Sequence, residues 1–442
     1  MPYFPATAKY SLPYRAIAMR QAAISARAAA LNNDGKGSGP SLDRGRAVET
    51  SAATASGLSG RSARITDEGL PPSIVTSSAV AQADYGAQGG DPTCGVDMDL
   101  STCVNRYGPA PAAIAALHTI EPADIVVHPY QAAEQLVDLY RWATGVRGGA
   151  MIAGRGASEF IWAMGRELDH ADVHVPLPAY TDYLKVFPGR GLSLDGEQLP
   201  TVEQVHAALK TSKFVIISNP HNPTGVHLDP KGLIAAAEAH PTATLVVDES
   251  YINFTADPIG NSVIGCDVPN LVVLRSTSKF YGIAATRAGI AWCAEPQRLH
   301  RLFGQQENWG LSGVDVRVAC AAVRDFHWST HTRVQMRADN AWLGQILAGI
   351  PGIEPSLNTN VHFQYVFCMR SAAVAEVFER HGIGVRRLGA AHGVRPDALR
   401  IVAPRGDERE RFAAAVAAVA AVKNSSNMLG SLKSNENGQR GA

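Results

Sequence analysis

Residues 271–287 read LVVLRSTSKFYGIAATR, and this stretch decides which fold the chain adopts. Leu271–Arg275 is a short, mainly apolar run of the kind that forms a buried strand. Lys279 follows among hydroxyl, apolar and glycine residues. A lysine in such a segment is a candidate Schiff-base amine, because burial lowers the pKa of the amine. The ordinary alternative is a lysine in a solvated loop.

Donor groups on both sides of Lys279 indicate an anion site. Ser276 and Ser278 lie just before the lysine, and Arg287 comes eight positions after it. Hydroxyls and a planar guanidinium together offer several hydrogen-bond donors to one phosphate group. The segment therefore predicts a phosphate held beside the candidate amine.

Apolar runs of the same kind alternate with helical patterns along the middle of the chain. Such alternation is typical of a parallel sheet covered by helices on both faces. The predicted strands are 150–153, 173–176, 214–218, 245–248, 271–275 and 289–292, and the predicted helices include 131–144, 158–167, 202–210 and 230–239. A helical stretch over 314–347, strands at 362–367 and 399–402 and helices at 372–380 and 408–421 predict a smaller C-terminal α/β domain.

Three further motifs follow predicted strands, at the edge where parallel sheets bind ligands. GRGASE (154–159) puts small residues at a helix N-terminus, which attracts anions. SNPHNPTG (218–225) fixes a polar loop whose Asn222 amide can face a ligand. VVDESY (246–251) ends a strand at Asp248, and a buried carboxylate needs a cationic partner. The plain alternative for the first motif is an N-cap at Ser158, and for the second it is a surface turn. For Asp248 it is a helix N-cap or a salt bridge at the edge of the core.

Taken together and in this order, the four motifs resemble those of the fold-type I, pyridoxal-phosphate-dependent aminotransferases of class I and II, over residues from about 95 to 422. The resemblance implies that Lys279 forms a Schiff base with pyridoxal 5'-phosphate and then moves the substrate proton. It implies that Asp248 pairs with the protonated ring nitrogen, and that Tyr251 and Asn222 donate to the phenolic oxygen of the ring. The other implied cofactor contacts are the phosphate cup Ala157, Ser158, Ser276, Ser278 and Arg287, and Tyr180 stacked on the ring.

The same resemblance implies the substrate contacts. Arg400, in Leu399-Arg400-Ile401, matches the arginine that binds the substrate's carboxylate through two hydrogen bonds. Asn105, Tyr107 and Arg386 are the other predicted substrate-binding residues. Arg386 and Arg405 are candidates for a second anionic group, such as the phosphate of an amino-acid phosphate. The alternative for these two arginines is a pair of surface ion pairs.

The segment DLSTCVNRYGP (99–109) resembles the N-terminal signature of the histidinol-phosphate aminotransferases, and it resembles that of the threonine-phosphate decarboxylases at least as much. Both usually carry a Tyr-Pro step where this chain has His128-Pro129-Tyr130. The expected function is transamination of a small amino acid or amino-phosphate, in ping-pong exchange with a 2-oxo acid. The alternatives are an α-decarboxylase, a specialised lyase or cyclase of the same fold, and a cofactor-binding protein without catalysis. The resemblance also implies a homodimer.

Composition excludes several other classes. The 442 residues include 40 basic and 40 acidic ones, and a net charge of zero predicts no attraction to nucleic acid or to an anionic membrane. No apolar run approaches the roughly 18–20 residues that cross a bilayer. The six cysteines are widely spaced and form no CxxC pair. That spacing predicts a reduced, cytoplasmic protein without a metal site.

The ends of the chain differ from its middle. Residues 1–80 are expected to be an N-terminal arm and linker, partly disordered. The first 33 residues have basic but no acidic side chains, which fits either a transit peptide or a leader arm. A large cofactor-binding domain is expected at 81–310, a small C-terminal domain at 311–422 and a polar, disordered tail at 423–442.

Overall fold

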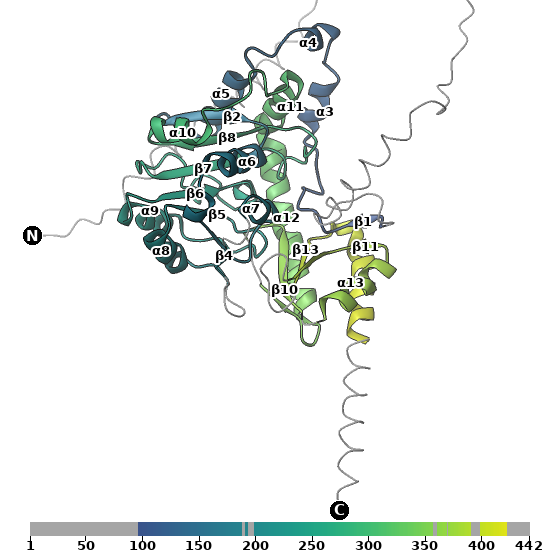
Figure 1. Ribbon diagram of the computed structural model, residues 1–442. Helices are drawn as coiled ribbons and strands as arrows, with labels where there is room; N and C mark the ends of the chain where they lie inside the picture. Colours follow the sequence, from purple (N-terminus) through teal and green to yellow (C-terminus); the bar gives the residue numbers. More distant parts are fainter. Residues whose placement is uncertain are drawn as a thin grey trace, which may run out of the picture. The chain divides into compact units, whose positions relative to one another are not determined.

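A computed structural model describes residues 96–187, 191–192, 199–356, 360–368, 370–389 and 398–421, all of which belong to one compact unit of the chain. A seven-stranded sheet organises this unit. Its spatial order is β2 (Ala150–Gly154), β8 (Gly289–Cys293), β7 (Leu271–Ser276), β6 (Thr244–Asp248), β5 (Phe214–Ser218), β3 (Val173–Pro176) and β4 (Gly191–Leu192) (Figure 1). Neighbours from β7 to β4 are parallel, and β8 is antiparallel to both β7 and β2. The predicted α/β fold with a mainly parallel sheet is confirmed.

Helices cover both faces of this sheet, and alternate strand residues face opposite layers. In β5, Val215 and Ile217 pack into one apolar cluster, whereas Ile216 packs into the other. This burial on both faces explains why the strands are continuous apolar runs. The first layer contains α5 (Ala132–Thr144), α8 (Val202–Thr211), α9 (Pro230–Ala239) and α11 (Gly313–Arg324), and the second contains α6 (Ala157–Glu167), α7 (Thr181–Val186) and α10 (Pro296–Phe303).

A second, antiparallel sheet follows in the C-terminal part of the chain. Its order is β12 (Arg386–Leu388), β13 (Ala398–Val402), β10 (Phe363–Phe367) and β9 (Glu354–Pro355). Helix α13 (Ser371–Arg380) and the helical residues 409–421 accompany it. The N-terminal strand β1 (Met98–Asp99) pairs in parallel with β11 (Ile383–Gly384), so residues far apart in sequence meet there. The domain boundary expected at residue 310 stays a prediction.

The helical stretch predicted over 314–347 is two helices rather than one. Helix α11 ends at Arg324, and α12 (Phe326–Ala348) begins directly after Asp325. The backbone of Asp325 leaves the helical region, and its side chain accepts a hydrogen bond from Trp328 N at 3.1 Å. A carboxylate that caps the next helix in this way starts a new helix at that point. Figure 1 shows α12 as a long helix that runs between the two sheets.

Two short helices precede α5 and carry exposed apolar side chains. They are α3 (Pro111–Leu117) and α4 (Pro122–Val126). None of the helices in the described residues combines the length and the apolar character that crossing a bilayer requires. The expectations for residues 1–80 and for the tail at 423–442 lie outside the described residues.

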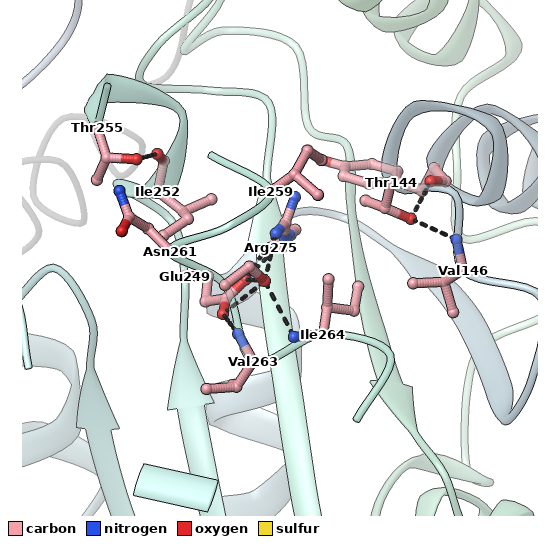
Figure 2. Close-up of polar contacts among 12 residues, drawn as sticks. Thr144, Val146, Glu249, Ile252, Thr255, Ile259, Asn261, Val263, Ile264 and Arg275 are labelled. Carbon is pink, nitrogen blue, oxygen red and sulfur yellow. Dashed lines mark hydrogen bonds and ion pairs between the residues drawn. The ribbon is translucent and has the colours of Figure 1, made fainter. Parts of the chain in front are cut away.

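A buried ion pair joins two neighbouring strands near their carboxyl ends (Figure 2). Glu249, directly after β6, accepts from Arg275 of β7, with Nε and Nη2 at 2.9 and 2.8 Å from Oε2. Ser262 Oγ and Val263 N donate to the same carboxylate at 2.7–2.9 Å. Both charged side chains are almost completely buried, at 0% and 4% exposure. Several hydrogen bonds compensate the charge of Glu249, as a buried carboxylate requires.

Candidate active site

The sequence motifs meet because of the strand directions. Asp248 ends β6, Ser276 ends β7, and the Asn222 loop follows β5, so all three lie at one edge of the sheet. Because β8 is antiparallel, the residues just before it lie at the same edge, and Ser276 pairs with Gly289. This places Arg287 next to Ser276 although the two are eleven positions apart in the sequence.

Hydrogen-bond donors gather beside Gly156, at the start of α6. Gly156 precedes α6 with a φ of +79°, and its backbone faces Arg287 and Ser276. A Cβ atom added there would lie 3.3 Å from Arg287 Nη2 and 3.6 Å from Ser276 Oγ. Ser278 completes the cluster: its Oγ lies 3.0 Å from Ser276 Oγ and 3.3 Å from Arg287 Nη1. Ala157 and Ser158 begin α6, whose N-terminus attracts anions.

Asp248 is a buried carboxylate that is held from both sides. Its Oδ2 accepts from Tyr183 Oη at 2.8 Å, and its Oδ1 accepts from Ser250 N and Oγ at 2.9 and 2.5 Å. Burial raises the pKa of Asp248, and these hydrogen bonds together with the charge of Lys279 act in the opposite direction. A cationic ring nitrogen facing this carboxylate would restore its ionised form.

Lys279 is partly accessible and follows the end of β7 by three residues. Burial lowers the pKa of its amine, and the cations Arg400 and Arg287 lower it further, against Cys103 and Asp182. A lowered pKa leaves more of the amine unprotonated near neutrality, and that form is the nucleophile. The geometry thus brings together a lysine with a lowered pKa, a buried carboxylate and a cluster of hydrogen-bond donors.

The three other predicted ring contacts lie around the same space. Asn222 Oδ1 accepts from Arg400 Nη1 at 2.6 Å. Tyr251 is buried, hydrogen-bonded to the Cys103 side chain, and its pKa is raised well above the ordinary value, chiefly by burial. Tyr180 donates to Asp182 Oδ2 at 2.9 Å, and burial raises its pKa too. Both tyrosines are therefore protonated donors at neutral pH.

Arg400 and Arg386 form a buried pair of cations on neighbouring strands. They are direct partners in the β12–β13 ladder, and each side chain is largely buried. Arg400 donates to two neutral oxygens, Asn222 Oδ1 at 2.6 Å and Ser101 O at 2.9 Å. Its Nε has no hydrogen-bond partner among the described residues, although it is buried. Such an uncompensated donor beside a second cation is suited to an anion.

Arg405 lies in a different environment from Arg386. It forms ion pairs with Asp407 at 3.0 Å and Glu408 at 3.5 Å, and 39% of its side chain is exposed. These contacts match the alternative of a surface ion pair, and the sequence already carried a signal for it in the two acidic residues that follow Arg405 closely.

The side chains of two predicted substrate-binding residues form hydrogen bonds within the protein instead. The Tyr107 hydroxyl donates to Asp339 Oδ2 at 2.6 Å, and burial with this carboxylate raises the pKa of Tyr107 to about 12. Asn105 Nδ2 donates to Phe280 O at 2.6 Å, and Asn105 Oδ1 accepts from Tyr107 N at 2.8 Å. Their assignment as substrate contacts stays a prediction that this geometry does not favour.

Sequence reasoning missed several residues that shape the site. Tyr183 and Ser250 hold Asp248, and Cys103 lies beside Tyr251. Ser250 was detectable, because a residue two positions after an aspartate often donates its N–H to that side chain. Tyr183 lies 65 positions from Asp248, so only the strand order brings the two together.

Among the described residues, no group of three or more His, Cys, Asp or Glu side chains is placed to hold a metal ion. A cavity of about 820 Å³ lies away from Lys279, between α3, α4, α5 and α11, and is lined in part by His128, Tyr130 and Arg317. His128 stacks on Trp309 with ring centroids 4.2 Å apart, and Tyr130 meets the same ring edge-on at 5.9 Å.

Comparisons with known proteins agree with this arrangement. A family model described as aminotransferase class I and II matches residues 98–417. A histidinol-phosphate aminotransferase of Symbiobacterium thermophilum is 29% identical over 333 residues, which are 73% of this chain and 90% of that protein. The crystal structure of a histidinol-phosphate aminotransferase from Sinorhizobium meliloti with pyridoxal-5'-phosphate superposes with a TM-score of 0.63 at 21% identity, covering 81% of this chain and 99% of that one. An L-threonine-O-3-phosphate decarboxylase from Porphyromonas gingivalis has the same fold, with a TM-score of 0.60 at 18% identity over 73% of this chain and 98% of that one.

Proposed function

The chain belongs to the class I and II aminotransferase family and uses pyridoxal 5'-phosphate, and from that premise we propose that it transaminates a small amino acid or amino-phosphate. The observation that carries this proposal is that Lys279 lies within electrostatic reach of Asp248 on one side and of Arg400, the ladder partner of Arg386, on the other. An amino donor with an anionic group fits between them.

The proposed cofactor contacts use the chain's own donors and acceptors. The cofactor phosphate would bind beside Gly156, where it would accept hydrogen bonds from the α6 N-terminus, Ser276, Ser278 and Arg287. Asp248, held in place by Tyr183 and Ser250, would pair with the ring nitrogen. Bound pyridoxal phosphate supplies an electron sink for the charge left at the substrate carbon when a proton departs.

Lys279 is the proposed base. In this proposal the Lys279 amine would hold pyridoxal 5'-phosphate covalently, and once released it would take the proton from the substrate Cα. The lowered pKa of Lys279 supports this role, because a base works best when its pKa lies near the working pH. A 2-oxo acid then accepts the amino group in the second half of a ping-pong cycle.

The arginine pair sets the substrate class in this proposal. A carboxylate binds Arg400 through its guanidinium, and a second anionic group, such as a phosphate, reaches Arg386 across the β12–β13 ladder. Arg405 takes no part, because its guanidinium is engaged by Asp407 and Glu408.

The test is an absorbance scan of the cofactor-loaded protein against a panel of amino donors, phosphorylated ones included. Half-transamination converts the bound cofactor to its pyridoxamine form and releases one equivalent of 2-oxo acid. A Lys279→Ala variant gives no such conversion, and borohydride reduction of the wild type, but not of this variant, attaches the cofactor to the peptide that contains residue 279.

The same scan separates the alternatives. Release of CO2 and an amine, without a requirement for a 2-oxo acid, would establish α-decarboxylation instead. Release of another fragment would indicate lyase chemistry. A bound cofactor that no donor alters would point to a binding protein without catalysis.

We further propose that a second copy of the chain covers the apolar surface at α3 and α4. Ile125, Val126 and Val127 are 60–79% exposed in one run, and Tyr130 is 70% exposed beside them. Contiguous exposed apolar side chains of this kind mark an interaction surface. Val126→Asp should convert a dimer to a monomer in light scattering, whereas Val334→Asp, at an exposed valine of α12, should not. A wild-type monomer would contradict this proposal.

A further inference from the structure

A short segment near the N-terminal side of the described chain connects the C-terminal sheet to the turn that carries Lys279. We call residues 100–110 the strap. At one end, Leu100 N donates to Gly384 O at 2.8 Å, and Val402 N donates to Leu100 O at 3.0 Å. The strap is therefore bonded to β11 and to the end of β13. From there it crosses to residues 279–282.

Three successive carbonyls of that turn accept hydrogen bonds from the strap. Lys279 O accepts from Asn105 N at 2.9 Å, Phe280 O accepts from Asn105 Nδ2 at 2.6 Å, and Tyr281 O accepts from Ala110 N at 3.2 Å. Asn105 supplies two of the three donors. Its remaining acceptor, Oδ1, bonds to Tyr107 N at 2.8 Å, and its side chain is only 4% exposed.

The strap and the turn also touch without space between them. Gly108 and Gly282 face each other so closely that a Cβ on Gly108 would lie 2.7 Å from Gly282 Cα, and one on Gly282 would lie 2.6 Å from Gly108 Cα. Gly282 has a φ of +68°, which favours glycine there for a second reason. The turn therefore cannot shift toward the strap.

We propose that Asn105 is a positioning residue that fixes the place of Lys279, rather than a substrate contact. The proposal rests on the proposed role of Lys279 as the cofactor-bearing amine. Asparagine suits the task because its amide binds one carbonyl as a donor while it accepts from a second backbone group. An error of about 1 Å in the place of a reacting group costs about 10²-fold in rate, so a residue that only holds the lysine still matters for catalysis.

The other end of the strap contacts Arg400, the proposed anion-binding residue. Ser101 O accepts from Arg400 Nη2 at 2.9 Å, only four residues before Asn105. The strap thus spans from the proposed anion-binding arginine to the proposed base. It holds constant the separation between the place where a substrate anion binds and the amine that takes the proton.

Two variants of Asn105 and one matched control test the proposal. Asn105→Asp keeps Oδ1 for Tyr107 N but replaces the donor to Phe280 O by an oxygen, and Asn105→Ala removes both contacts. Asn270→Ala is the control, because Asn270 is 1% exposed and its Nδ2 donates to three carbonyls, of Ala237, His240 and Ala243, at the opposite end of β7. All three changes remove buried hydrogen bonds, so loss of stability alone affects them alike.

The first measurement uses the protein without cofactor. In hydrogen exchange followed by mass spectrometry, peptides that cover residues 276–287 should exchange at least about tenfold faster in Asn105→Ala than in the wild type, as expected for the loss of a buried hydrogen bond. Asn270→Ala should leave these peptides unchanged. Equal exchange in the wild type and Asn105→Ala would overturn the proposal, and this result does not depend on any activity of the chain.

The second measurement uses the cofactor-loaded protein. In both Asn105 variants kcat should fall by about tenfold or more while KM changes less than about twofold, and the pH midpoint of the bound cofactor's absorbance should shift. Asn270→Ala should keep the midpoint. A rise in KM at unchanged kcat and midpoint would make Asn105 a substrate contact. Absence of a trapped adduct on Lys279 in the wild type would instead reject the proposed function and leave the exchange result standing.

Discussion

Arg386 and Arg400 lie directly opposite each other in the antiparallel ladder of β12 and β13, and each is 8% exposed. Like charges in directly opposite positions repel. Burial lowers the pKa of Arg386 to about 10, and repulsion by the Arg400 charge contributes to the shift. In the proposed function, an anionic group of the substrate bound between the two guanidiniums would offset this repulsion.

Arg386→Ala should therefore raise KM for a phosphorylated donor by about 10- to 100-fold, the size expected for a lost charge-assisted hydrogen bond. The KM for a donor without phosphate should change little. Arg387→Ala is the matched control, because Arg387 is exposed on the same strand and its side chain points to the other side of β12. Equal effects of Arg386→Ala on both donors would place the phosphate elsewhere.

Asp248→Asn should change catalysis and stability in opposite directions: kcat should fall, while the stability of the cofactor-free protein near neutral pH should rise. In the protein without cofactor, burial raises the pKa of Asp248 above its unfolded value. The native state then holds its proton more tightly than the unfolded state, so this group's contribution is full at acid pH and is lost as the pH rises through the native pKa. Asp248→Asn has no titratable group at this position, so its stability does not fall with rising pH for this reason.

We therefore expect cofactor-free Asp248→Asn to gain stability relative to the wild type as the pH rises from about 4 toward 8. Thermal unfolding across this range measures it. With cofactor bound, kcat of the variant should fall by at least about 10²-fold, because the neutral amide does not hold the ring nitrogen protonated. A stability difference that is independent of pH would show that Asp248 has an ordinary pKa in the free protein.

The sequence was informative where local pattern decides the structure. Phe214–Ser218 and Val173–Pro176 are strands at the predicted residues, because a run that is apolar on both faces has few other buried conformations. The meeting of Asp248, Asn222 and Lys279 was also predictable, since parallel strands end at one edge. The site roles assigned to these residues stay predictions.

Contacts that depend on register across the whole fold were not predictable. The acidic residues after Arg405 indicated its ion pair with Asp407, but the pairing of Arg386 with Arg400 depends on the register of two strands. Asn105 and Tyr107 lie in the segment for which the resemblance implies substrate contacts. Their side chains instead donate hydrogen bonds to Phe280 O and to Asp339 Oδ2. The end of one helix and the start of the next at Asp325 were not predictable, because the helical pattern continues on both sides of this residue.

His221 should make the fold sensitive to acid. It is buried, its Nδ1 lies 2.8 Å from Thr224 Oγ1, and burial lowers its pKa to about 3. A histidine with a depressed native pKa contributes its full stability above the unfolded value of about 6.5 and loses it as the pH falls toward the native pKa. At pH 5, about 1.5 units below 6.5, the loss is about 2 kcal/mol.

His221→Asn keeps a short polar group for Thr224 and cannot titrate. The free energy of unfolding of this variant should fall by about 2 kcal/mol less than that of the wild type between pH 7.5 and pH 5. Urea titrations at the two pH values measure the difference, and His118→Asn, at an exposed histidine, provides the control. An unchanged acid dependence in His221→Asn would mean that this imidazole stays accessible to protons in the native state.

The ion pair of Glu249 and Arg275 (Figure 2) should contribute to the stability of the fold mainly because each buried charge compensates the other. Removal of one partner leaves the other charge buried without compensation. Glu249→Ala and Arg275→Ala should therefore each cost about 3–5 kcal/mol in the free energy of unfolding. The apolar double variant Glu249→Leu with Arg275→Met should cost less than the sum of the two single changes, because no buried charge remains.

The exposed pair Lys213 and Asp172, 2.8 Å apart, is the matched comparison. Its two single changes should each cost far less than those of the buried pair and should add, because water screens the charges. Since Glu249 directly follows Asp248 and Arg275 directly precedes Ser276, loss of the buried pair should also slow capture of the cofactor in the surviving folded fraction. If the buried pair behaved additively like the exposed pair, its charges would have access to water in the folded protein, and the two strand ends would be held by their backbone hydrogen bonds alone.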